Sequence, residues 1–228
     1  MRVTVLELAA SWDASAAVLD DVAARIAAGP PTELVLLPEA SLCGYVSPAR
    51  DFDLTRFAEP IDGPLARRCA AIATGARVHL VAPLVLREAG AIYNAMACFD
   101  PHGAIAFVYR KRHPWVPETW ATPGPSAAPV VELAGRRVTI AICYDLHFLA
   151  DELQPADLLL FPSAWVERPD SRPARLARLA RDFAMHVVNA NWAPGVVRVP
   201  GQGGSCVVGP DGEFIASAPP GGRIDVEL

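Results

Sequence analysis

The stretch from Val138 to Asp145 reads VTIAICYD, a run of apolar and β-branched residues followed by a cysteine, a tyrosine and a carboxylate. Such a run predicts a buried strand. Cys143 then stands at the end of that strand, where α/β proteins commonly place their binding and reactive groups. Because a cysteine thiolate is a strong nucleophile, Cys143 is a candidate nucleophile, and a plain buried strand cysteine is the alternative.

Two other predicted strands also end in charged residues. Glu39 follows LVLLP at 34–38, and Lys111 follows AIAFVYR at 104–110. Burial would raise the pKa of the Glu39 carboxyl and make it a plausible general base near neutral pH. Lys111 is the only lysine in a chain otherwise rich in arginine, which indicates a place that needs a compact ammonium. A loop glutamate and a solvated basic turn are the alternatives, but we expect Glu39, Lys111 and Cys143 to meet in one pocket.

Three sequence patterns occur twice and in the same order. RVTV at 2–5 returns as RVTI at 137–140, LVLLP at 34–38 returns as LLLFP at 158–162, and CFDPHGAI at 98–105 resembles VVGPDGEFI at 207–215. The repetition predicts two related halves that meet within 124–136, a stretch rich in proline, glycine, alanine and serine.

Each half alternates predicted strands and helices and contains a hairpin, which indicates an α/β layered fold. The strands are expected at 2–8, 34–38, 78–85, 93–99, 104–110, 137–142, 157–161, 187–191 and 223–228. The helices are expected at 13–28, from a cap at Asp62 to Gly75, and at 171–185. Two such halves would pack sheet on sheet with the helices outside. We therefore expect a four-layer αββα sandwich that forms one domain over residues 1–228.

The composition excludes several classes of protein. The 228 residues are 52% hydrophobic with a net charge of −5, and no basic stripe points to nucleic acid. No apolar run is long enough to span a bilayer. Five cysteines without a C-x-x-C spacing argue against a disulfide framework or a zinc site. No metal, nucleotide or flavin motif is present and no signal-peptide layout precedes the first strand, so we expect a cytoplasmic protein without a cofactor.

The motifs around the three candidate residues resemble those of the nitrilase superfamily of carbon–nitrogen hydrolases, over nearly the whole chain. LPE at 37–39 with a following Gly-Tyr, YRKRH at 109–113, ICYD at 142–145 and ADLLLFPSAW at 156–165 carry the resemblance. It implies an αββα sandwich, a Glu39–Lys111–Cys143 triad, a second active-site glutamate at Glu118, a small-molecule substrate and a homodimer formed through the helices.

The resemblance also implies a reaction. Cys143 would attack an amide, Glu39 would move the protons, and Lys111 with the backbone N–H of Tyr144 would hold the oxyanion of a thioester pathway. The residues expected to line the pocket are aromatic neighbours of the triad in sequence: Tyr45, Trp115, Trp120, Tyr144, His147 and Trp165. His147 stands where many members of the superfamily have arginine, and motifs of several subfamilies are mixed, so the substrate is left open.

Four alternatives stay open at this point. The same triad serves N-carbamoyl or nitrile hydrolysis, and an amine in place of water would give acyl transfer. A cysteine–histidine hydrolase would use His113 or His147. The fold also accommodates a catalytically silent interaction module, although all three triad positions are filled.

Overall fold

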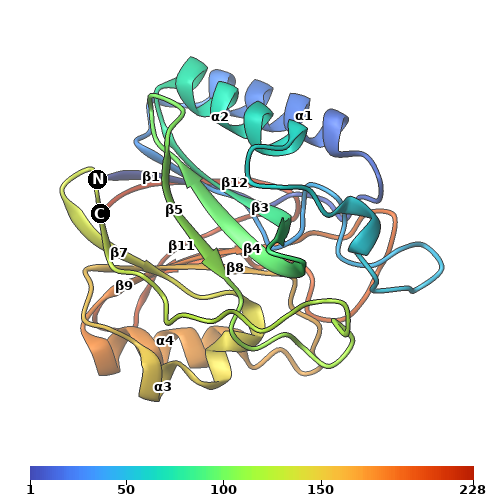
Figure 1. Cartoon of the computed structure of the whole chain (residues 1–228). Helices are drawn as coiled ribbons and strands as arrows, with labels where there is room; N and C mark the ends of the chain where they lie inside the picture. Colours follow the sequence, from blue (N-terminus) through green and yellow to red (C-terminus); the bar gives the residue numbers. More distant parts are fainter.

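The computed structural model describes residues 1–228 and has four layers, with two β-sheets face to face and helices on both outer faces (Figure 1). The first sheet has the spatial order β12 (Arg223–Glu227), β1 (Arg2–Leu6), β2 (Leu34–Leu36), β3 (His79–Glu88), β4 (Ala91–Phe99) and β5 (Ile105–Arg110). The second has the order β11 (Phe214–Ser217), β10 (Cys206–Val208), β9 (His186–Asn191), β8 (Leu158–Ser163), β7 (Arg136–Ile140) and β6 (Val131–Leu133).

The helices lie on the two outer faces. Helices α1 (Ser15–Ala28) and α2 (Pro64–Ala76) cover the first sheet, and α3 (Leu149–Glu152) and α4 (Arg172–Phe183) cover the second (Figure 1). Two 3-10 helices, η1 (Thr55–Phe57) and η2 (Cys143–His147), lie in connecting segments. The expected αββα sandwich is therefore confirmed. No helix is both long and apolar enough to cross a membrane.

The two halves repeat one pairing scheme. In the first half β1, β2 and β3 are parallel, and β4 and β5 add antiparallel strands. In the second half β7, β8 and β9 are parallel, and β10 and β11 add antiparallel strands. The three repeated sequence patterns fall on β1 and β7, on β2 and β8, and on the β4–β5 and β10–β11 turns. The two related halves are thus confirmed.

The outermost strand of the first sheet comes from the far end of the chain. β12 pairs antiparallel with β1, and Thr4 lies opposite Asp225. The Thr4 hydroxyl donates a hydrogen bond of 2.7 Å to Asp225 Oδ1 across 221 residues of sequence. In the second sheet the same edge position is filled by β6, which precedes β7 directly. The first sheet is therefore complete only once the second half is present.

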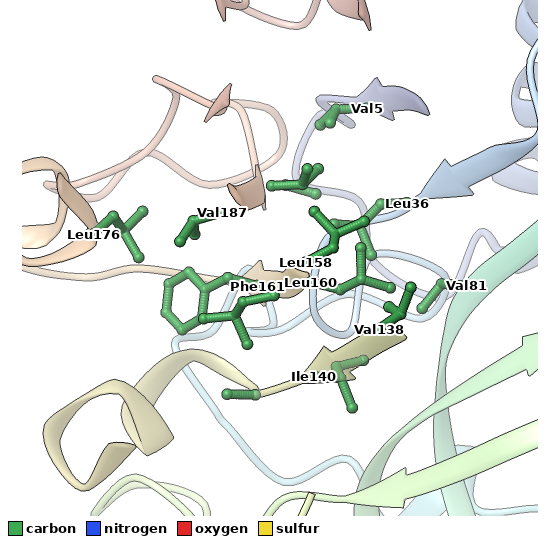
Figure 2. Close-up of a cluster of buried hydrophobic side chains, with 14 of the residues drawn as sticks. Val5, Leu36, Val81, Val138, Ile140, Leu158, Leu160, Phe161, Leu176 and Val187 are labelled. Atoms are coloured by element: carbon green, nitrogen blue, oxygen red, sulfur yellow. The ribbon is translucent and has the colours of Figure 1, made fainter. Parts of the chain in front are cut away.

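Alternate residues of the central strands serve two cores. Leu34 and Leu36 of β2 lie in the cluster that joins the two sheets and extends to α4, and Val35 and Leu37 lie in the cluster beneath α1 and α2. Figure 2 shows side chains of both sheets in the inter-sheet cluster, among them Leu36 and Leu160. Strands covered on both faces read as continuous apolar runs, which explains why LVLL and LLLF lack polar alternation.

The sequence prediction was wrong in details of the connections. No side chain caps α2 at Asp62, because the helix begins at Pro64 after Gly63. The carboxylate of Glu59 instead accepts the N–H groups of Leu65 and Ala66, at 3.2 and 2.9 Å. The strand β6 and the short helices η2 and α3 were not predicted at all.

Leu160 tests the inter-sheet core, because its side chain is fully buried there. We expect Leu160→Ala to lower the free energy of unfolding by about 2–5 kcal/mol, through lost burial and a residual cavity. Urea unfolding followed by circular dichroism measures this. Ile105→Ala is the matched control, since Ile105 is 45% exposed and its loss should change stability by no more than about 0.5 kcal/mol. Equal effects of the two variants would contradict the described core.

Candidate active site

Three strand ends bring the candidate residues to one end of the sandwich. Glu39 follows β2 in the first sheet, Lys111 follows β5 of the same sheet, and Cys143 opens η2 just after β7 of the second sheet. Strand ends in such folds carry the loops that build sites. The site is therefore assembled from both halves.

The Lys111 ammonium lies between two carboxylates. Its Nζ donates to Glu39 Oε1 at 2.7 Å and to Glu118 Oε1 at 2.8 Å. All three side chains are buried, with at most 1% of any of them exposed. An ammonium has three N–H donors, so these two bonds leave one donor free.

Burial and pairing act against each other on the pKa values in this cluster. Burial alone would lower the pKa of Lys111, but the neighbouring carboxylates Glu118 and Glu39 reverse this, and the pKa is raised. Burial raises the pKa of Glu118, although the Lys111 ammonium opposes that shift. Lys111 therefore stays charged at neutral pH and keeps the two carboxyl groups together.

Glu39 is held by two further hydrogen bonds. Its Oε1 accepts the side-chain amide of Asn94 at 2.8 Å, and its Oε2 accepts the backbone N–H of Ala164 at 2.9 Å. We did not assign Asn94 a role from the sequence. The available signal was an amide inside an otherwise apolar strand, because a buried polar group needs a partner.

Glu118 is fixed in the same way from the other side. Tyr45 donates its hydroxyl to Glu118 Oε1 at 2.7 Å, and the backbone N–H of Trp115 donates to Glu118 Oε2 at 3.2 Å. Tyr45 and Trp115 also stack, with ring centroids 6.5 Å apart. The second glutamate is thus an integral part of the buried cluster.

Cys143 occupies a tight backbone turn. Its φ is 47°, a left-handed value that is uncommon for residues other than glycine and that clusters at functional sites. Burial raises the pKa of its thiol, with Glu39 adding to the rise and Lys111 opposing it. The resting thiol is therefore protonated at neutral pH, and a nucleophilic role needs a base that removes the proton.

The carboxylate of Asp145 ties the cysteine turn to the lysine strand. Its Oδ2 accepts the Tyr109 hydroxyl at 2.9 Å and the Ile142 N–H at 3.0 Å, and its Oδ1 accepts the His113 N–H at 2.9 Å. These partners flank Cys143 on one side and Lys111 on the other. Asp145 was noted in the sequence only as part of a motif, because none of its partners but Ile142 is a near neighbour in the chain.

A cavity of about 230 Å³ opens onto Cys143. It is lined by Tyr45, Trp115, Cys143, Tyr144, Ala164, Trp165, Val166, His147 and Glu167. Five of the residues expected to surround the nucleophile are among them, while Trp120 packs against the apolar cluster that contains Tyr45 and does not line the cavity. Glu167 was missed, because nothing in its local sequence distinguishes it from a surface glutamate.

The two histidines near the cysteine in sequence are engaged elsewhere. His147 stacks on Trp165 with centroids 5.9 Å apart, and its Nδ1 lies 3.4 Å from Arg175 Nη1. His113 stacks on Phe148 and contacts the Glu152 carboxylate at 3.2 Å. Neither makes a hydrogen bond with Cys143, so the geometry gives no support to a cysteine–histidine pair.

The profile of the carbon–nitrogen hydrolase family matches residues 3–225. The chain is 33% identical over 195 residues to the hydrolase in the pqqF 5′ region of Pseudomonas protegens, covering 82% of this chain and 67% of that protein. It is 29% identical to a formamidase of Bradyrhizobium diazoefficiens, over 80% of this chain and 50% of that protein. It is also 29% identical to an omega-amidase of Xenopus tropicalis, over 82% of this chain and 72% of that protein.

Solved structures resemble this one over its full length. A variant of the amidase from Nesterenkonia sp. AN1, described with acrylamide added at its active-site cysteine, has a TM-score of 0.84 and is 25% identical, covering 100% of this chain and 93% of that one. The fold, the profile match and the relatives agree, and the chain belongs to the carbon–nitrogen hydrolase family.

Proposed function

We propose that this protein hydrolyses the carbon–nitrogen bond of a small-molecule amide to a carboxylic acid and ammonia, with Cys143 as nucleophile. The observation that carries the proposal is the buried Lys111 ammonium between Glu39 and Glu118, next to a cysteine on a left-handed turn. The named amidases among its relatives support the same chemistry. The chain spans between 50% and 72% of the length of the curated relatives named above. The proposed activity is therefore argued from the residues of this chain.

The first half-reaction forms a thioester. Glu39 takes the thiol proton as the Cys143 sulfur attacks the amide carbonyl carbon, and the carbonyl electron pair moves onto oxygen. The free N–H donor of Lys111 and the backbone N–H of Tyr144 stabilise that oxyanion. When the oxyanion collapses, the carbon–nitrogen bond breaks and Glu39 returns the proton to the leaving nitrogen, which departs as ammonia.

The second half-reaction releases the acid. Glu39 removes a proton from water as the water oxygen attacks the thioester carbonyl. The carbon–sulfur bond then breaks, the carboxylic acid leaves, and Glu39 returns the proton to the Cys143 sulfur. Glu118 holds Lys111 through both halves, and Tyr45, Trp115, His147 and Trp165 enclose the acyl group in the cavity.

We also propose that the chain forms a single domain and assembles as a homodimer. We take residues 1–228 as one domain, because one core cluster joins residues of both sheets. A homodimer in the cytoplasm is the arrangement that the family resemblance favours. Sedimentation velocity of the purified protein tests the dimer.

Ammonia release is the direct test of the activity. We expect release from at least one short amide in a panel that also contains N-carbamoyl compounds and nitriles, and none from the Cys143→Ala variant. Release that persists in Cys143→Ala would refute the assigned nucleophile. A folded protein that releases nothing would favour the silent module, and a product formed with added amines would favour acyl transfer.

Glu39 and Lys111 should be needed for turnover. We expect Glu39→Gln to lower kcat by about 10²–10⁴, because the proton carrier is lost. We expect Lys111→Arg to lower it by about 10²–10³, because a guanidinium cannot place the same donor on the oxyanion. Glu132→Gln, at an exposed position on β6, is the matched control and should leave kcat unchanged. Undiminished turnover by Lys111→Arg, measured as ammonia release, would refute its assigned role.

Asp145 should matter without touching the substrate. Asp145→Asn replaces one acceptor by an N–H group that faces N–H and O–H donors, so we expect a loss of about 1.5–3 kcal/mol in stability. Slight displacement of Cys143 should lower kcat by up to about 10²-fold with little change in KM. Asp151→Asn, on the exposed side of α3, controls for the charge. Wild-type stability and kcat in Asp145→Asn would contradict this role.

A further inference from the structure

The wall of the cavity around Cys143 has an unusual charge distribution. Besides the cysteine, its lining contains two ionisable groups that titrate between acid and neutral pH, Glu167 and His147. No lysine or arginine lines it. The buried cluster behind it holds two carboxyl groups and one ammonium. The charge that a bound acyl group meets therefore depends chiefly on Glu167 and His147.

Glu167 presents a carboxylate that is already organised. Its Oε2 accepts the Trp165 indole N–H at 3.0 Å, the Ser171 N–H at 2.9 Å and the Ser171 hydroxyl at 2.6 Å. Burial alone would raise the pKa of Glu167, but the hydrogen bonds from Ser171 and Trp165 outweigh it and the pKa is lowered. The Glu167 carboxylate beside Trp165 is thus charged at neutral pH, and the neighbouring Arg175 guanidinium also lowers its pKa.

His147 supplies no compensating cation. Burial lowers the pKa of its imidazole, and the Arg175 guanidinium lowers it further, against the opposing effect of Glu167. The Nε of Arg175 donates to Ser171 Oγ at 3.0 Å, and its Nη1 lies 3.4 Å from His147 Nδ1. The guanidinium therefore contacts His147 but is not among the residues that line the cavity.

The size of the cavity limits the acyl group. Sites for drug-sized ligands enclose about 300–1,000 Å³, whereas this cavity encloses about 230 Å³. Its other lining groups are the aromatic rings of Tyr45, Trp115, Tyr144 and Trp165 and the small apolar side chains of Ala164 and Val166. Such a wall favours a short, largely apolar chain.

We propose that the acyl group hydrolysed at Cys143 is short and carries no negative charge, so that simple monoamides are substrates and amides with a second, carboxylate group are rejected. The inference rests on the proposed amide hydrolysis and adds the class of substrate. A carboxylate in the cavity would lose its water next to the Glu167 carboxylate and would find no cation in the lining, which is an uncompensated cost.

Succinamide and succinamate test the charge directly, because they have nearly the same shape and differ by one charge at neutral pH. We expect kcat/KM for succinamide, measured by ammonia release and counted per amide group, to exceed that for succinamate by at least about tenfold. Butyramide serves as the apolar reference and should be at least as good a substrate as succinamide.

Two variants test whether Glu167 and His147 in the cavity lining cause the preference for succinamide over succinamate. Glu167→Gln keeps an acceptor for Trp165 and Ser171 and removes the charge, and His147→Arg adds a cation. Both should raise kcat/KM for succinamate relative to succinamide by about tenfold. Glu213→Gln, an exposed substitution in the β10–β11 turn, removes the same charge outside the cavity and should leave the ratio unchanged.

The outcomes separate this inference from the proposed function. Succinamate hydrolysed as well as succinamide, with no release by Cys143→Ala, would overturn the charge selectivity and leave the amidase activity in place. An unchanged ratio in both wall variants would also overturn it. Hydrolysis of none of the three amides by the folded protein would overturn the amidase proposal and this inference with it.

Discussion

The ammonium of Lys111 is the constraint on which the site depends. Removing three charged side chains from water is costly, and it is tolerable only when each finds a partner of opposite charge and its remaining hydrogen bonds. The Lys111 ammonium is the partner of opposite charge for both Glu39 and Glu118. Asn94 and Ala164 donate further hydrogen bonds to Glu39, and Tyr45 donates one to Glu118. The strand ends and the loop that carry these groups are therefore held in one arrangement, because any of them displaced alone would leave a buried charge unpaired.

The two halves share a topology but contribute unequally to the site. In the repeat, the proline that precedes Glu39 corresponds to Pro162, so the position equivalent to Glu39 is Ser163. The half with the glutamate supplies the charge, and the other half supplies the N–H of Ala164 that accompanies it. The strand end after β2 thus carries the carboxylate of Glu39, and the equivalent strand end after β8 carries the N–H group that binds this carboxylate. The two strand ends therefore meet where the two sheets face each other.

The fold was predictable because its signals are local, and the same signals indicated Glu39, Lys111 and Cys143 as candidate residues. Apolar runs interrupted by one charged residue identify strand ends, and a lone lysine in an arginine-rich chain is visible without a structure. Asn94 and Asp145 were not assigned roles, because each acts mainly through partners remote in the chain or contributed by backbone N–H groups. Glu167 has its partners Trp165 and Ser171 close by in the sequence, but their spacing is no recognisable motif. The capping role of Glu59 was not predicted either. Its carboxylate accepts the first N–H groups of α2 from outside the usual capping positions, so no recognisable spacing in the sequence indicates it.

The pairing of β12 with β1 has a consequence for how the chain folds. The strand β1 acquires its outer neighbour from a strand whose paired residue lies 221 positions further along the sequence. Contacts so distant in sequence close late, since loop-closure entropy must be overcome before they form. Until then β1 presents an unpaired edge, which is a template for association with other chains. Folding of this protein therefore includes an interval in which β1 depends on protection from aggregation.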